Sequence, residues 1–282
     1  MGIAEAKPNT APAGVRHFDH FALPTGSIER SEKFYTEVLG LRTLVKGAPR
    51  IVGGIFMKIG TRHHLGFFEH RPINTGTMPK RENVQGYPRV AFAVPASDFA
   101  ATTERIRAAC AIVEEIHEDN LPGAERGLAF VDPEGNIMEV FPNAANQPIT
   151  VSHFHFETPA LAAALEFYTG VLDFKEIHRS DERAVLAIPT GQALLLHQVS
   201  ELSAATQTYF DGRHFAFSVT DANFHAIVAK LEARGIQQGD DLGGVRRRKP
   251  GELGTYFQDP TNGMHIQMLN SDSSEFSKQF AA

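Results

Sequence analysis

The apolar and polar positions near the start of the chain predict a short strand that is followed at once by an amphipathic helix. Val15 to Leu23 is rich in aromatic and β-compatible residues and ends at a Pro-Thr-Gly turn. Ser27 then stands where an N-cap belongs, apolar residues recur at helical spacing from Phe34 to Leu39, and Gly40 is placed to end the helix. Three further strands up to Glu69 give this first unit the order βαβββ.

The same order of elements recurs three more times along the chain. A strand followed by a helix is predicted within residues 87–109, 149–171 and 213–234, and shorter strands follow each pair. The sheet of one such unit has an apolar face that it cannot cover alone, so two units are expected to close around a shared hollow. We therefore predict an α+β fold of four βαβββ modules in two tandem pairs, each pair forming a cup-shaped mixed sheet around a central cavity.

The linker between the two pairs is predicted at Asn143 to Pro148, where the strand pattern is interrupted. This divides the chain into an N-terminal domain at 15–145 and a C-terminal domain at 146–270. Residues 1–14 and 271–282 are predicted to be tails. The first of these tails is polar, rich in Ala, Pro and Gly, and lacks the apolar core of a signal peptide.

Composition and charge narrow the classes of function. The formal net charge is −6, so nucleic-acid binding is not expected, and no apolar run approaches the length that spans a bilayer. The single cysteine, Cys110, excludes an internal disulfide and fits a reducing cytoplasm. We expect a cytoplasmic protein whose partner is a small molecule, and the exposed edges of the predicted sheets favour a homo-oligomer.

One motif is written twice, once in each half of the chain. Tyr35 follows His20 by 15 residues, and Tyr168 follows His153 at the same distance. In both copies the tyrosine belongs to a Phe-Tyr…Val-Leu signature on the predicted helix. A strand that bears a histidine, followed by this helix, therefore occurs once per half.

A second motif is a turn before the last strand of each half. The turns are Asp-Pro-Glu-Gly at 132–135 and Asp-Pro-Thr-Asn-Gly at 259–263. Glu139 and Gln267 each lie four residues after the turn glycine. The two halves therefore carry an oxygen donor at corresponding positions, a carboxylate in one and an amide in the other.

Several of the thirteen histidines lie on predicted strands, where alternating side chains can share the face that lines the hollow. The second half offers His153, His214 and Gln267, with His197 nearby. Two imidazoles and one oxygen donor suit a divalent first-row metal. A facial site of two histidines and one carboxylate is the usual arrangement for Fe(II), with Mn, Zn, Co and Ni as alternatives.

The first half offers a competing ligand set of His20, His64 and Glu139. The position that matches His214 in this half is Arg89, a cation that would repel a metal or face an anionic substrate. We therefore favour the second half as the metal-binding half and a structural role for the first.

Together these motifs resemble the vicinal oxygen chelate superfamily, which includes glyoxalase I, bleomycin-resistance proteins and extradiol ring-cleaving dioxygenases. The resemblance is carried by His20 with its Phe-Tyr…Val-Leu-Gly helix, by the segment Asp132 to Glu139, and by the copies of both in the second half. It covers nearly all of Val15 to Leu269. Four units in one chain are similar to the type I extradiol dioxygenases.

This resemblance implies a role for each candidate residue. The iron ligands of the type I enzymes correspond to His153, His214 and Gln267, a histidine that handles substrate protons corresponds to His197, and a tyrosine corresponds to Tyr256. In such a site a metal binds the catechol oxygens and O2 while His and Tyr move protons. The expected function is an extradiol-type ring-cleavage dioxygenase, an oxidoreductase that acts on a catechol-like aromatic and serves aromatic compound degradation.

Two other functions stay open. Gln267 stands where the dioxygenases usually have Glu, and some glyoxalase I relatives use Gln as a ligand, so a glyoxalase-like isomerase or lyase that uses a divalent metal without O2 is one alternative. A non-catalytic small-molecule-binding protein, as among the bleomycin-resistance relatives, is the other. Glu157 shares a strand face with His153 and His155 by period-two spacing, where it either supplies the missing carboxylate or faces solvent at the end of the strand.

Overall fold

The computed structural model describes residues 14–47, 54–61, 63–69, 81–118, 121, 124–204, 213–239, 246–247 and 253–270. Except for residue 14, the predicted tails lie outside these ranges. None of the helices in the described ranges is long and apolar enough to cross a membrane.

The first module has the predicted order βαβββ. It consists of β1 (His17–Thr25), α1 (Ile28–Leu39), β2 (Arg42–Lys46), β3 (Gly54–Ile59) and β4 (His63–Glu69). The side chain of Ser27 accepts a hydrogen bond from the backbone N–H of Arg30 and so caps α1. Gly40 ends the helix in the left-handed conformation, with φ of 72°, which glycine adopts without strain. The helix bounds read from the sequence are therefore explained by its caps.

The other three modules repeat this order with small variations. Module 2 contains β5 (Arg89–Pro95), α2 (Ala96–Ala109), β6 (Val113–Ile116), β7 (Gly127–Val131) and β8 (Ile137–Asn143). Module 3 contains β9 (Thr150–Thr158), α3 (Leu161–Gly170), β10 (Lys175–Arg179), β11 (Arg183–Ala187) and β12 (Ala193–Gln198). Module 4 contains β13 (His214–Val219), α5 (Asp221–Glu232), two short strands β14 (Gln238–Gly239) and β15 (Arg246–Arg247), β16 (Leu253–Gln258) and β17 (His265–Asn270).

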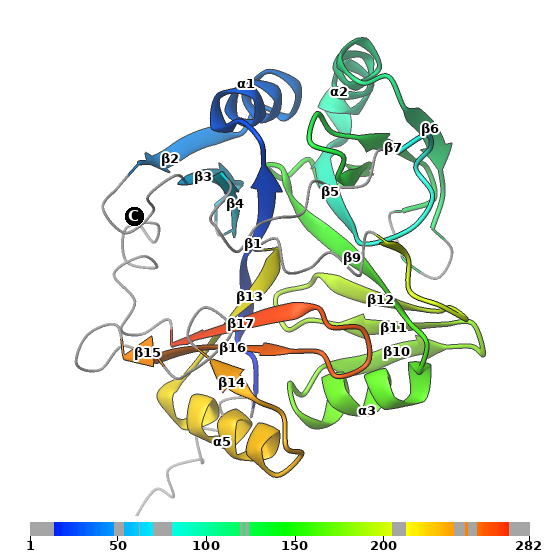
Figure 1. Cartoon of the computed structure of the whole chain (residues 1–282). Helices are drawn as coiled ribbons and strands as arrows, with labels where there is room; N and C mark the ends of the chain where they lie inside the picture. Colours follow the sequence, from blue (N-terminus) through cyan, green and yellow to red (C-terminus); the bar gives the residue numbers. More distant parts are fainter. Residues whose placement is uncertain are drawn as a thin grey trace, which may run out of the picture.

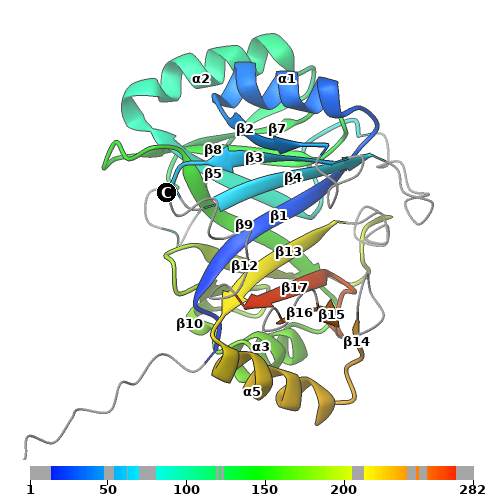
Figure 2. The same cartoon turned by 90° about the vertical axis from the view of Figure 1, so that its left-hand side faces the viewer.

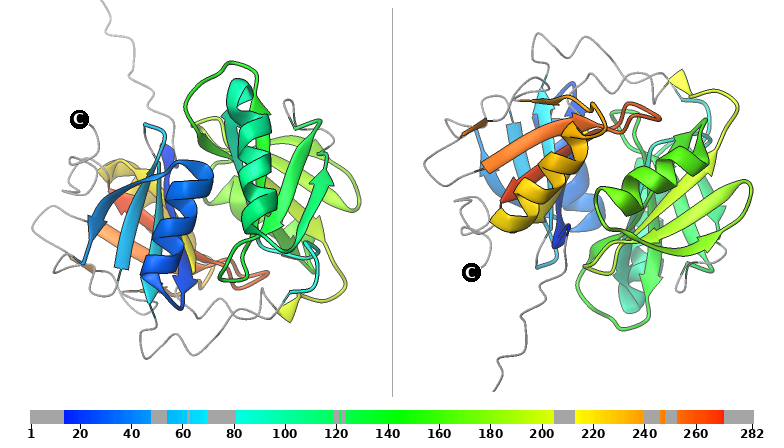
Figure 3. Two further views of the ribbon diagram at one scale, coloured as in Figure 1. Left: turned by 90° about the horizontal axis from the view of Figure 1, so that it is seen from above. Right: turned by 90° about the horizontal axis from the view of Figure 1, so that it is seen from below.

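Two large mixed sheets confirm the predicted α+β fold of four modules. The first, called sheet A here, has nine strands with the main order β14-β16-β17-β13-β1-β4-β3-β2 and with β15 beside β16. The second, sheet B, has eight strands in the order β10-β11-β12-β9-β5-β8-β7-β6. Sheet A therefore joins module 1 to module 4, and sheet B joins module 2 to module 3. Figure 3 shows these two bodies side by side, blue with yellow to red in one and cyan with green in the other.

This pairing differs from the consecutive pairing that the tandem repeat suggests. In each sheet the first strands of the two modules are antiparallel neighbours, β1 with β13 and β5 with β9. All four modules present the same kind of first strand, so the hydrophobic pattern does not determine which two modules pair. The choice is made by tertiary packing.

The modules of each half of the chain are joined in a different way, through their helices and turns. Helices α1 and α2 lie together at one end of the molecule, and α3 and α5 lie at the other end (Figures 1 and 2). The hydroxyl of Tyr35 on α1 donates to Asp132 of module 2 at 2.8 Å, and both groups are buried. The repeated Tyr and Asp-Pro motifs thus fasten modules together. The domain division at 15–145 and 146–270 stays a prediction, because bonds run both within and between the halves.

An aromatic core fills the space between the two sheets. Phe154 of β9 lies 4.8 Å from Phe18 of β1 and 4.7 Å from Phe215 of β13, measured between ring centroids. All three rings are buried. Burial of each such side chain contributes about 1.5–3 kcal/mol, so the central strands of both sheets are fixed by their apolar faces. Their opposite faces are left to carry polar residues.

Candidate metal centre

A β-bulge precedes the repeated histidine in both sheets. On β1 the register with β13 shifts between Phe18 and His20, so Asp19 is an extra residue. On β9 the register with β5 shifts in the same way around Ser152, one residue before His153. Each bulge turns the preceding polar side chain towards the histidine. Asp19 Oδ1 lies 2.6 Å from His20 Nδ1, and Ser152 Oγ lies 3.0 Å from His153 Nδ1.

The polar face of sheet B holds a compact cluster of potential metal ligands. Glu139 of β8, His153 and His155 of β9 are all buried, and one ligand atom from each lies within 4.8 Å of the others. The carboxylate Oε2 is 3.5 Å from His153 Nε2 and 3.2 Å from His155 Nε2. Among the described residues this is the one group of three or more His, Cys, Asp or Glu side chains that meets this criterion.

The hydrogen bonds around the cluster leave its inner atoms free to bind an ion. Glu139 Oε2, His153 Nε2 and His155 Nε2 are buried and make no hydrogen bond to a described residue. Buried polar atoms are normally satisfied, so three unsatisfied atoms that converge on one point fit a metal site. A proton on Nδ1 of each imidazole, donated to Ser152 or to His197 Nε2 at 2.9 Å, leaves both Nε2 lone pairs directed at that point.

The electrostatics of the cluster also favour the protonation states in which its side chains bind a metal. Burial opposes the charge on Glu139, but the adjacent His155 and His153 hold its pKa well below the usual range. Burial lowers the pKa of His153 to about 4, although Glu139 acts in the opposite direction. Glu139 is therefore ionised and His153 is neutral near pH 7, which are the forms in which carboxylates and imidazoles bind metals.

Arg89 of β5 completes the immediate surroundings of the cluster. Its Nη1 donates to Glu139 Oε1 at 3.1 Å, on the side of the carboxylate away from the unsatisfied Oε2. Its register partner on β9 is His155. The corresponding position in sheet A, on β13, is occupied by His214. The two sheets therefore present related but chemically different sets of side chains.

A cavity of about 550 Å³ borders His197, the hydrogen-bond partner of His155. Its walls include Tyr87 and His197, and the remaining lining residues are His178, Ser180, Glu182, Arg183 and Gln198. The Tyr87 ring stacks on His197 with 4.6 Å between centroids, and His197 contacts His155 through the 2.9 Å bond. Burial lowers the pKa of His197 to about 2, so its imidazole is neutral. His197 thus connects the cavity with a candidate metal ligand.

Sheet A carries a second set of donors at related positions. His20 Nε2 of β1 lies 3.2 Å from His214 Nε2 of β13. The register places His64 beside His20 and places Gln267 two strands away in the same row. The Oε1 atom of Gln267 is buried and has no hydrogen bond to a described residue. The Tyr256 ring lies 5.3 Å from the His214 ring. Gln267 and Glu139 occupy corresponding register positions, so this set contains an amide where sheet B has a carboxylate.

The structure divides both ligand sets predicted from the sequence between the two sheets. In the favoured set, His153 lies on sheet B, whereas His214 and Gln267 lie on sheet A. The competing set is divided in the same way, because Glu139 lies on sheet B and its partners lie on sheet A. The physical reason is the nested pairing of modules. One divided set is His153, His214 and Gln267, and the other is His20, His64 and Glu139.

The two proton-handling residues predicted from the resemblance are also separated. His197 remains with His153 in sheet B, while Tyr256 lies in sheet A. His64 and His197 are not structural equivalents despite their equal spacing from the repeated histidines. His64 is opposite His20, whereas His197 is opposite Glu157, four residues beyond His153. Equal spacing in sequence therefore does not guarantee equal register.

Sequence reasoning missed His155 as a ligand candidate. Its signal was its period-two spacing from His153, which puts both side chains on one face of β9. Glu157, on the same face, does not supply the missing carboxylate here. Its Oε1 instead accepts hydrogen bonds from the backbone N–H and the hydroxyl of Ser203, both at 2.6 Å.

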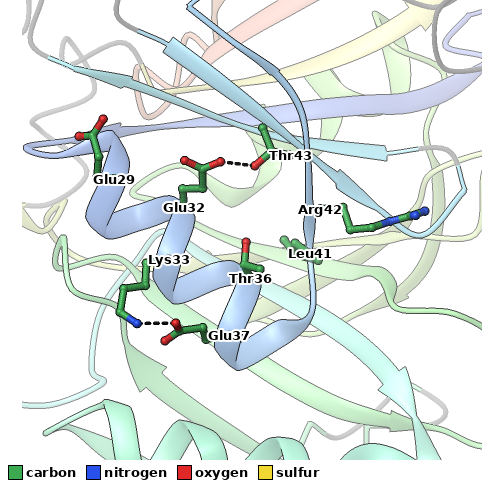
Figure 4. A pocket seen from close by; sticks show the side chains of 8 residues that line it. All are labelled: Glu29, Glu32, Lys33, Thr36, Glu37, Leu41, Arg42 and Thr43. Carbon is green, nitrogen blue, oxygen red and sulfur yellow. Dashed lines mark hydrogen bonds and ion pairs between the residues drawn. The ribbon is translucent and has the colours of Figure 1, made fainter.

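A second hollow lies on the outer surface between α1 and β2 and is drawn in Figure 4. Several of its polar side chains bind one another. Lys33 pairs with Glu37, and Thr43 donates to Glu32, as the dashed lines show. It belongs to the edge of sheet A, and its described side chains form no cluster of metal ligands, so we do not assign a function to it.

The family follows from a match over most of the chain. The model of the Glyoxalase/Bleomycin resistance protein/Dioxygenase superfamily matches residues 17–140 and again 150–268. The chain therefore belongs to this superfamily, as its four βαβββ modules and two mixed sheets indicate.

Solved structures similar to the whole chain come from more than one activity class. A putative dioxygenase from Bacillus subtilis subsp. subtilis str. 168 is 14% identical with a TM-score of 0.70, over 94% of this chain and 88% of that one. Glyoxalase I from Zea mays is 17% identical with a TM-score of 0.66, over 94% of this chain and 95% of that one. At these identities the likeness establishes the shared fold alone.

Proposed function

We propose that the protein is a metal-dependent dioxygenase of the extradiol type that acts on a catechol-like aromatic. The observation that carries this proposal is the buried set of Glu139, His153 and His155, with ligand atoms within 4.8 Å of one another. Two imidazoles and one carboxylate are the protein ligands typical of non-haem Fe(II) oxygenases, so Fe(II) is the favoured metal. When bound, such a metal would supply the open positions at which a substrate and O2 meet.

The residues of this chain would hold and prepare the site as follows. Ser152 and His197 fix the ring orientation of His153 and His155 from behind, which keeps both Nε2 atoms on the inner side. His197 borders the cavity and is neutral, and because its Nε2 accepts from His155, its Nδ1–H is placed to donate a hydrogen bond to an oxygen bound there. Tyr87 lines the same cavity, and its ring stacks on His197.

Oxygen consumption tests this function directly. Protein purified without O2 and reconstituted with Fe(II) should consume O2 with a panel of catechols and give a yellow ring-fission product. His153→Ala should abolish this activity, whereas His20→Ala in sheet A is the matched control and should retain it. Iron bound at Glu139, His153 and His155 without O2 uptake on any catechol would refute the proposal.

One observation favours a second candidate function, a glyoxalase-like isomerase or lyase centred on sheet A. There the unsatisfied Oε1 of buried Gln267 accompanies His20 and His214, whose Nε2 atoms are 3.2 Å apart. A neutral amide with two imidazoles would leave a divalent metal strongly electrophilic, which suits polarisation of adjacent oxygens without O2. This candidate predicts anaerobic turnover of a 2-oxoaldehyde–thiol adduct with Ni(II), Co(II) or Zn(II), lost in His214→Ala and kept in His153→Ala.

A further inference from the structure

Arg89 and Glu139 form a largely desolvated ion pair at the candidate metal centre. The side chain of Arg89 is 14% exposed and that of Glu139 is 0% exposed, with Nη1 and Oε1 3.1 Å apart. Arg89 Nε donates to the carbonyl of Gly86 at 2.8 Å, and the guanidinium lies 5.1 Å from the centroid of the Tyr87 ring. These contacts place the guanidinium between the carboxylate and the aromatic ring that lines the neighbouring cavity.

The ion pair changes the charge balance of any metal complex in this site. Arg89 already neutralises Glu139, so a divalent cation bound to Glu139 and two neutral imidazoles would add two positive charges to a buried space. Buried charge that is not compensated is costly. The other buried carboxylate on this face, Glu157, is engaged by Ser203 rather than directed at the cluster. The negative charge that balances the divalent cation must therefore come from a ligand.

Arg89 is suited to receive such a ligand. Nε and Nη1 bind described residues, whereas Nη2 makes no hydrogen bond to a described residue. A guanidinium presents its donors as a planar fork that matches anionic oxygens, and it keeps its charge at all physiological pH values. It can therefore exchange its bond to Glu139 for a bond to an anionic oxygen, which leaves both carboxylate oxygens available to the metal.

We propose that Arg89 is the anion-binding residue of this site and couples metal binding to substrate binding. The ligand it selects is a small molecule with two adjacent oxygens, at least one of them ionised, as in a catecholate. The inference rests on the proposed metal centre and deepens it. By linkage, such a ligand tightens metal binding by the same factor as the metal tightens ligand binding.

Equilibrium dialysis with Mn(II) tests the coupling without relying on turnover. For the wild type, Mn(II) affinity should rise about 5- to 150-fold when saturating 4-nitrocatechol is present, the usual range for coupled sites. Arg89→Met should bind Mn(II) more tightly than the wild type when the catechol is absent, because Glu139 has lost its counter-ion. Its affinity should then change little when 4-nitrocatechol is added. Glu139→Gln identifies which part of the bound Mn(II) belongs to sheet B.

The outcomes separate this inference from the proposed function. Mn(II) bound through Glu139, with equal coupling in the wild type and Arg89→Met, overturns the role of Arg89 alone. Mn(II) binding that Glu139→Gln leaves unchanged overturns the metal centre itself. If Arg89→Met does not fold, as judged by circular dichroism, the coupling factor is measured on Arg89→Lys instead. It keeps the charge but not the planar fork, so its coupling factor should fall below that of the wild type, and an unchanged factor refutes the inference.

Discussion

Lowering the pH should destabilise the metal-free protein because two histidines are buried in neutral form. Burial lowers the pKa of His153 and of His64 from 6.5 to about 4. Between these values the unfolded chain binds a proton at each histidine and the folded chain does not. The stability associated with each residue is therefore fully present above pH 6.5 and is lost as the pH falls towards 4.

The size of the loss in folding stability follows from these pKa shifts. A pH of 5 lies about 1.5 units below the unfolded-state pKa of each histidine, which corresponds to roughly 2 kcal/mol of lost stability per residue. His153 is 0% exposed and His64 is 2% exposed, so solvent screening does not reduce this figure greatly. Glu139 adds to the loss below its unfolded pKa of 4.5, because its folded pKa is lower still. The total is a large fraction of the about 5–15 kcal/mol that stabilises a typical protein.

Urea denaturation in EDTA, followed by circular dichroism at pH 7.5, 6.5, 5.5 and 5.0, measures this effect. The free energy of unfolding should fall with each step below pH 6.5. His153→Gln should show a shallower dependence on pH than the wild type, while His225→Gln, on the exposed side of α5, controls for removal of an imidazole elsewhere. A free energy of unfolding that stays constant between pH 7.5 and 5.0 would refute the assignment of buried neutral histidines.

Two further substitutions test the packing and charge of the centre. Glu139→Gln keeps the side-chain shape but removes the counter-ion of Arg89, so the free energy of unfolding should fall by about 1.5–3 kcal/mol in urea denaturation; unchanged stability would contradict an ionised Glu139. Gly127→Ala should cost about 1–3 kcal/mol because its Cβ would overlap the ring of Phe141. Gly254→Ala, where a Cβ meets atoms no closer than 3.4 Å, is the matched control, and equal effects of the two alanines would contradict the overlap.

The local structure of each module was readable from the sequence because its signals are local. Ser27 and Gly40 mark the ends of α1 through capping and left-handed geometry, and both act as predicted. The repeated Tyr and Asp-Pro motifs correctly indicated a duplicated fold. Their physical role, the hydrogen bond from Tyr35 to Asp132 between modules, required the structure, because it joins residues 97 positions apart.

The choice of partners between modules could not be read in the same way. Glu139 and His153 were both recognised as ligand candidates, but they were assigned to different sets because each half was expected to form its own cup. The antiparallel pairing of β5 with β9 brings them together instead. Similar first strands in all four modules give no sequence signal for this pairing, so the candidate residues were recognised but the cluster that the structure brings together was not.

The bulges explain why even the register of the site was hidden. One extra residue, Asp19 in one sheet and Ser152 in the other, interrupts simple alternation just before each repeated histidine. Both residues then bind the outer nitrogen of that histidine. A period-two reading across the whole strand therefore assigns some side chains to the incorrect face, and the partners of the imidazoles go unnoticed.

The amount of metal bound by defined variants tests the central claim most directly. Elemental analysis of protein reconstituted with Fe(II) should find one iron per chain in the wild type and in His20→Ala, and only traces in His153→Ala. This result would place the metal with Glu139 and His155 in sheet B. Iron that is retained by His153→Ala and lost from His20→Ala would contradict the account and assign the metal to sheet A.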